Sequence, residues 1–183
     1  DVMRRSNVAG AMQYVPELTW LLFLRILDER ETTEAGEHAV LGVPFTPSLE
    51  APYRWQDWGA PPDANGRQGA TRRAKDSSAG ALLSFVNNEL LPHLKSFATS
   101  SSATPRQKVI AEILSGVERV RIDTETNFKD VLDRVHEITE AGIDTQHAFP
   151  ISQVYEGLLL KMGEKGGDGG QFYTPREVVR AMI

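Results

Sequence analysis

Cysteine is absent from the 183 residues of this chain. Its absence excludes disulfides, iron–sulfur clusters and thiolate zinc sites, and it fits a reducing compartment. Histidine is also scarce, and no two histidines have the spacing of metal ligands. The histidines are His38, His93, His136 and His147. We therefore expect no metal site.

Long apolar runs and an excess of positive charge are missing as well. The longest apolar run, residues 18–27, is too short to span a bilayer and contains Arg25. No apolar stretch typical of a signal peptide precedes it. Because the net charge is −5, contact with DNA would have to come from a local basic cluster. These features favour a cytoplasmic protein without a membrane segment.

The apolar residues that are present follow helical spacing, which predicts a mainly α fold. Residues 18–30 are apolar on nearly every side, as in a helix at the centre of a bundle. Pro16 and Glu17 suit the first turn of this helix, and the polar residues 28–31 indicate where it emerges into solvent.

Further helices are expected after a long irregular loop at residues 39–80, whose prolines and glycines forbid a long regular element. Their expected positions are residues 81–97, 106–122, 128–141 and 152–162. Pro92 predicts a kink in the first of them, and Gly142 suits the end of the third. Strand-like alternation of useful length and internal repeats are absent from the sequence.

Two clusters occur within the loop at residues 39–80. Tyr53, Trp55 and Trp58 belong to an aromatic island that either pins the loop onto the core, which we favour, or forms a binding surface. The second cluster is basic, in an acidic chain. Its members are Arg67, Arg72, Arg73 and Lys75. Such a run is usually solvated, and it is also the best local candidate for contacts with DNA phosphates.

The stretch GGDGGQFYTPREVV at residues 166–179 combines two signals. Thr174 begins a T-P-R-E capping box, and Thr104 begins the equivalent T-P-R-Q, so this motif by itself does not indicate a ligand. The capping box does not explain residues 169–172, GGQF, which therefore need another explanation. Glycines let the backbone approach a ligand, and Phe172 offers a stacking face. Together with the free N–H groups of a helix N-terminus, these features suit an adenosine or carboxylate ligand. No phosphate-loop motif is present.

The segment GQFYTP at residues 170–175 resembles the one that opens the catalytic domain of N6-adenine DNA methyltransferases. More narrowly, the chain resembles the modification subunit of type I restriction-modification systems, because further landmarks occur in the family's order. These landmarks are ELTWLLFLR at residues 17–25, YRW at 53–55, FVNNELLP at 85–92 and YEGLL at 155–159.

The resemblance implies a helical N-terminal domain over residues 1–165 and, at residues 166–183, the start of a Rossmann-like domain that binds S-adenosylmethionine. The cofactor-contacting residues that it implies are Gln171, Phe172, Tyr173, Thr174, Pro175 and Arg176. It also implies methyl transfer to adenine N6 in double-stranded DNA. The implied partners are a specificity subunit, a restriction subunit and a second modification subunit.

The family's D-P-x-x-G-x-G loop and its catalytic [ND]-P-P-[FY] tetrapeptide are missing, and Ala60-Pro61-Pro62-Asp63 departs from the latter at both ends. We therefore place no catalytic residue in this chain. The chain lacks an initiator Met and stops within an apolar repeat, so we expect an N-terminal fragment that is inactive alone and binds the cofactor negligibly. The alternative is a helical protein-interaction module tethered to an unrelated domain.

Overall fold

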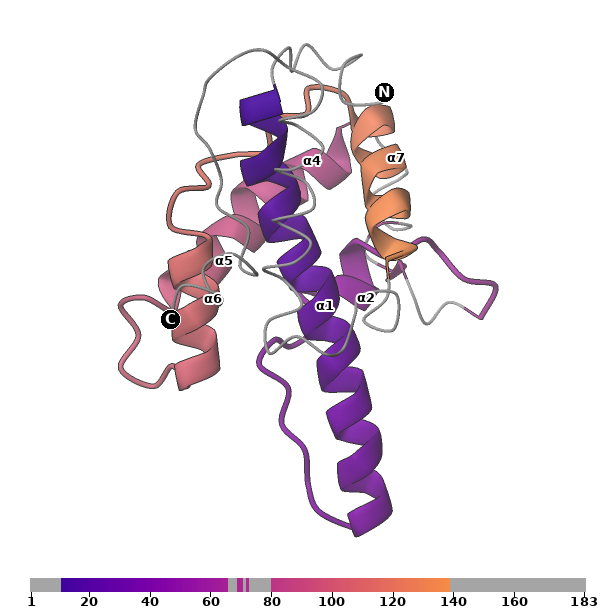
Figure 1. The fold of residues 1–183 in the computed structure, drawn as a ribbon, viewed down its shortest axis with the longest axis vertical. Coiled ribbons are helices and arrows are strands. Elements are labelled where there is room, and N and C mark those ends of the chain that lie inside the picture. Colours follow the sequence, from indigo (N-terminus) through magenta and orange to yellow (C-terminus); the bar gives the residue numbers. More distant parts are fainter. Residues whose placement is uncertain (1–10, 66–68, 71, 73–79, 139–183) are drawn as a thin grey trace, which may run out of the picture.

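The computed structural model describes residues 11–65, 69–70, 72 and 80–138, with side chains from Glu17 onward. Within these residues every regular element is helical, which confirms the mainly α prediction for this part of the chain (Figure 1). The elements are α1 (Ala11–Leu41), α2 (Trp55–Trp58), α4 (Ala81–Phe85), the π-helical turn η2 (Val86–Leu90), α5 (Leu91–Ser96), α6 (Pro105–Ile113) and α7 (Glu125–His136). The helix expected at residues 152–162 and the Rossmann-like start at 166–183 lie outside the described residues.

Helix α1 passes through the middle of the molecule, with α5 and α6 on one side and α2 and α7 on the other, and α4 lies toward α7 (Figure 1). Its apolar stretch is buried all round: Leu21 is 0% exposed and even Arg25 is only 9% exposed. A helix without a solvated face requires neighbours on every side. The central position expected for residues 18–30 is therefore confirmed.

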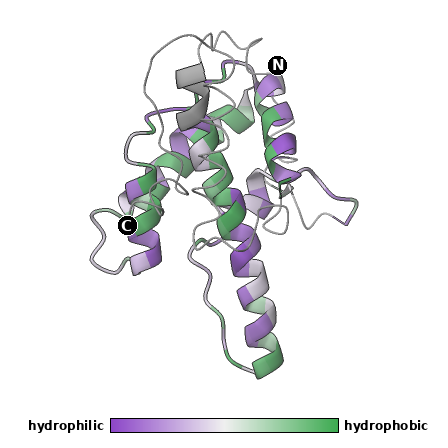
Figure 2. Cartoon of the chain, viewed as in Figure 1, coloured by the Kyte–Doolittle hydropathy of each residue, from purple (hydrophilic) through white to green (hydrophobic). Residues whose placement is uncertain are grey.

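The bounds of α1 are wider than residues 18–30. The helix begins at Ala11, so Pro16 and Glu17 lie inside it and not in its first turn. It also continues to Leu41, because residues 31–41 are rich in Glu and Ala and the Arg30–Glu34 pair, at 3.9 Å, supports it. Its last turns project beyond the other helices, and the apolar tip exposes 88% of Val40 (Figure 2).

The aromatic island packs into the core, as we favoured. Trp55 and Trp58 lie on α2, are 1% and 0% exposed, and meet edge to face at 5.2 Å. Trp58 also stacks on Trp20 of α1 at 6.3 Å. The island therefore anchors the irregular segment after α1 onto the helical core, and two of its rings are unavailable for a ligand.

Residues 81–96 are helical throughout but change type at their centre. A proline in a helix lacks the N–H that would bond the carbonyl four residues back, which for Pro92 belongs to Asn88. The π-helical turn η2 lies between α4 and α5 and ends two residues before Pro92, which is in the first turn of α5. The predicted kink therefore takes the form of a π-helical turn.

Helix α6 begins as predicted and ends early. Thr104 accepts the N–H of Gln107 at 3.2 Å, and the Gln107 side chain accepts the N–H of Thr104 at 2.9 Å, which completes the capping box. The helix ends at Ile113 and not at Ile122. Ser115 and Gly116 follow, and glycine at a helix end favours termination over continuation.

Helix α7 begins after its N-cap Thr124 and ends at His136, five residues before the expected end at Ala141. Its first residue, Glu125, also reaches another helix, because Glu125 Oε2 accepts the N–H of Leu82 at the start of α4 at 2.9 Å. This bond satisfies one of the orphan donors of α4. The expected cap at Gly142 lies outside the described residues.

Candidate functional site

The predicted cofactor segment, Gln171 to Arg176, lies outside the described residues. The same holds for Arg67, Arg73 and Lys75 of the basic cluster. These predictions therefore remain predictions. Among the predicted site residues, the structure describes Arg72.

Arg72 is buried and ion-paired. It is 5% exposed, and its Nη1 lies 2.8 Å from Asp133 Oδ1 on α7. A buried guanidinium that is held by a carboxylate on another element fastens the loop to α7. Because this arrangement leaves Arg72 little surface for a phosphate, we remove it from the proposed DNA contacts.

Three acidic side chains of α1 accept hydrogen bonds from backbone N–H groups of distant segments, a role that was not predicted from the sequence. Glu17, Asp28 and Glu31 accept from Arg121, Gln56 and Ser48, respectively. The prediction that residues 28–31 emerge into solvent is wrong for Glu31, which is 7% exposed. Helical spacing could have predicted these buried positions, because Asp28 and Glu31 follow Leu24 and Leu27 by four residues and share their buried face.

Glu31 makes the most extensive of these contacts. Both of its carboxylate oxygens accept the N–H of Ser48, at 3.0 and 3.1 Å, and Arg106 Nη1 lies 3.2 Å from Oε1. Arg106 also pairs with Glu34 through two bonds of 2.8 and 3.1 Å. The Gln107 side chain donates to the carbonyl of Ser48. The start of α6 and the loop at Ser48 are thereby tied to the same part of α1.

Asp28 lies near charges of both signs, and its Oδ1 accepts the N–H of Gln56 at 3.4 Å. Burial raises the pKa of the Asp28 carboxyl group from 3.8 to about 6. The bond from Gln56 and the nearby charges of Arg25 and Arg54 lower that pKa, whereas the charge of Asp57 raises it. Desolvation is the largest effect, so ionisation of Asp28 is less favourable in the folded state than in water.

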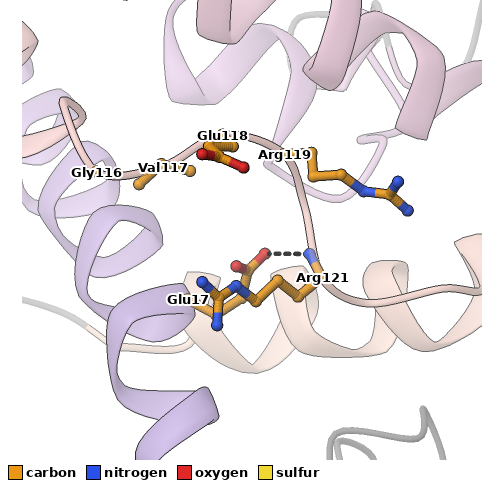
Figure 3. A pocket seen from close by; sticks show the side chains of 6 residues that line it. All are labelled: Glu17, Gly116, Val117, Glu118, Arg119 and Arg121. Atoms are coloured by element: carbon orange, nitrogen blue, oxygen red, sulfur yellow. Dashed lines mark hydrogen bonds between the residues drawn. The ribbon is translucent and has the colours of Figure 1, made fainter.

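Glu17 borders a small cavity between α1 and the segment that joins α6 to α7 (Figure 3). The cavity has a volume of about 60 Å³, and its lining comprises Glu17, Gly116, Val117, Glu118, Arg119 and Arg121. Glu17 is 4% exposed, and its Oε1 accepts the N–H of Arg121 at 3.3 Å.

Burial raises the pKa of the Glu17 carboxyl group from 4.5 to about 7, against the opposing effects of the Arg121 N–H, the Trp20 indole and the Arg121 charge. Trp20 Nε1 is buried without a hydrogen-bond partner of standard geometry, but its N–H still favours the ionised carboxyl group. A carboxyl group with this pKa can exchange a proton near neutral pH.

The cavity is nevertheless too small for a cofactor or a nucleotide. Pockets that hold such ligands measure roughly 300 to 1,000 Å³. Its volume of about 60 Å³ has room for water. Within the described residues, no three potential ligand side chains gather for a metal ion, and no helix has the length and apolarity that a membrane crossing needs.

Comparison with known proteins identifies relatives of the whole chain. The family model described as N-6 DNA Methylase matches residues 146–183. The EcoEI methylase subunit of a type I restriction enzyme from Escherichia coli is 30% identical over 184 residues, which cover 100% of this chain and 34% of that protein.

Two solved structures share the fold. The first is the crystal structure of a modification subunit assigned to a type I restriction enzyme from Vibrio vulnificus YJ016, with a TM-score of 0.76, 31% identity and coverage of 100% of this chain and 37% of that chain. The second comes from work on complex assembly and conformational transition of a type I restriction-modification system, with a TM-score of 0.63, 33% identity and coverage of 98% and 32%. The chain spans about a third of the length of these relatives.

Proposed function

We propose that this chain, which resembles modification subunits of type I restriction enzymes over its whole length, is the N-terminal region of such a subunit. The observation that carries the proposal is the position of the methylase match. Residues 146–183 match the family model, and they contain every residue that we assigned to the cofactor. The match begins before residue 166, where we place the start of the catalytic domain.

In the intact subunit, we propose transfer of a methyl group to adenine N6 within a specific DNA sequence. S-adenosylmethionine, when bound, supplies the electrophilic methyl group. The residues of this chain that would hold it are Gln171 to Arg176. Phe172 would provide an aromatic face for the adenine ring, and the helix that the sequence predicts after Thr174 would provide unpaired N–H groups.

The described helices would have a structural part in this enzyme. Their buried carboxylates and aromatic anchors fix the irregular segments to α1, which suits a rigid domain that helps to enclose DNA and to bind partner subunits. The proposed partners are double-stranded DNA, a specificity subunit, a restriction subunit and a second modification subunit. The proposed location is the cytoplasm.

Calorimetry with S-adenosylmethionine tests the proposal. The intact subunit should bind the cofactor, and with its partner subunits it should methylate adenine in DNA. The 183-residue chain alone should bind negligibly, because it contains neither the D-P loop nor the catalytic tetrapeptide of the family. Micromolar binding of S-adenosylmethionine by the chain alone would contradict the proposal that this chain carries only part of the cofactor site. An intact complex that leaves adenine unmethylated would contradict the proposed reaction.

A further inference from the structure

The segment that joins α6 to α7 is held by two side chains at successive backbone positions. The N–H of Val120 donates to Asn87 Oδ1 of η2 at 2.8 Å. The next N–H, that of Arg121, donates to Glu17 Oε1 of α1 at 3.3 Å. Glu17 and Asn87 therefore fix the segment from two different helices.

Between these bonds and the end of α6, the segment lies at the surface, and Val117 is its one partly buried side chain. Gly116 has no atom within 4 Å of the position where a Cβ would lie, and Glu118 and Arg119 are exposed. The cavity of about 60 Å³ lies between this stretch and Glu17 (Figure 3). Val120 is 3% exposed and Val117 is partly buried against the core, so these two side chains hold the segment closed in this structure.

We propose that residues 116–121 form a flap that rests on α1 while the Glu17 carboxyl group is protonated and opens more readily when that group is ionised. Closing the flap buries Glu17, whereas opening it gives the carboxyl group access to water. A buried charge is costly unless it is fully paired, and Glu17 has one backbone donor at 3.3 Å and no ion pair within 4.0 Å among the described residues.

The charged groups around Glu17 come from the flap itself. Glu118, Arg119 and Arg121 line the cavity. The charge of Arg121 acts on the Glu17 carboxyl group, and no charged side chain described on η2 or α7 has a comparable effect. Asn87 and Trp20 contribute neutral groups. Because burial outweighs these favourable contacts, the closed flap holds the proton more tightly than the open flap does.

Hydrogen exchange of the full chain tests the flap. The pKa of Glu17 is about 7 with the flap closed, and 4.5 is its usual value in water. Linkage between these values makes the opening equilibrium roughly 50- to 100-fold more favourable at pH 8 than at pH 5. After correction for the intrinsic pH dependence of exchange, protection of the Val120 and Arg121 amides should fall by that factor. At both pH values it should stay below the protection of the Leu24 amide in α1, which is buried in the core and needs unfolding of the core to exchange.

Two variants provide the controls. Glu17→Gln cannot ionise, so its Val120 and Arg121 amides should keep the same protection at pH 5 and pH 8. Glu118→Gln removes an exposed charge from the same cavity and should behave like the wild type. The proposal is overturned by wild-type protection that does not depend on pH, by Val120 and Arg121 amides that are as well protected as Leu24, or by a Glu17 carboxyl ¹³C resonance that titrates near pH 4.5.

Discussion

Glu31 and Ser48 are joined by both oxygens of one carboxylate, which accept a single backbone N–H at 3.0 and 3.1 Å. Ser48 is 9% exposed and Glu31 is 7% exposed, so water cannot readily replace this contact. It fixes the chain that returns from the projecting end of α1. A buried N–H that loses its acceptor costs about 1 to 3 kcal/mol, and more when the acceptor is charged.

Glu31→Ala should therefore destabilise the fold by about 2 to 4 kcal/mol, measured by urea unfolding at pH 7. Glu34→Ala is the matched control, because Glu34 pairs with the same Arg106 but its side chain is 29% exposed. An exposed pair contributes about 1 kcal/mol or less. Equal losses in the two variants would show that the Ser48 contact contributes little.

Asp28→Asn should stabilise the protein at neutral pH and leave its stability unchanged in acid. Burial raises the pKa of Asp28 from 3.8 to about 6, so the folded state binds a proton that the unfolded state has released. The wild type therefore loses stability as the pH rises from about 4 through 6. Asparagine can still accept the N–H of Gln56, and the expected gain above pH 6 is on the order of 1 to 2 kcal/mol.

Thermal unfolding at a series of pH values measures this difference between Asp28→Asn and the wild type. Asp130→Asn, which changes an exposed side chain on α7, is the control and should have no pH-dependent effect of this size. A variant that is less stable than the wild type at pH 7 would contradict the unfavourable ionisation of Asp28.

Arg72→Ala should destabilise the fold by about 1 to 3 kcal/mol, because it removes a buried side chain and leaves Asp133 without its 2.8 Å partner. Arg134→Ala is the control on the same helix. Its guanidinium is 77% exposed and lies 3.3 Å from Glu137, so its loss should cost less than about 0.5 kcal/mol. Urea unfolding of both variants measures the difference, and similar values would contradict the anchoring role of Arg72.

Neutralising Arg67, Arg73 and Lys75 together should flatten the salt dependence of DNA binding by the assembled enzyme. Each phosphate contact contributes about 0.9 to the slope of log K against log[salt], so three contacts contribute about 2.7. Fluorescence anisotropy between low and moderate salt measures the slope, with Arg134→Gln as a control. If the slope does not change, the basic cluster is only solvated surface.

Features that depend on residues close in sequence could be predicted. The capping box at Thr104 needs only the neighbouring Gln107 and was predicted correctly, as was the apolar centre of α1. The end of α6 was not predicted correctly, because Val117 and Val120 continue the apolar spacing of the helix. What competes with the helix there is the Asn87 acceptor for the N–H of Val120, 33 residues away in sequence.

The roles of the acidic residues in α1 were missed for the same reason. A glutamate after an apolar run is usually solvated, and Glu31 is buried because Ser48 and Arg106 come to it from other segments. Likewise, Pro92 indicated a distortion, but its π-helical form depends on how residues 86–90 pack. Tertiary contacts therefore decide what local preference leaves open.

Cofactor binding by the intact subunit tests the central claim, that residues 166–183 line an S-adenosylmethionine pocket. Phe172→Ala should weaken binding of the cofactor in calorimetry by about tenfold or more, since stacking on an adenine ring contributes about 1 to 3 kcal/mol. Thr104→Ala, which alters the equivalent capping box of α6, should bind as the wild type does, and circular dichroism should show that both variants keep their helices. Wild-type affinity in Phe172→Ala would contradict the account.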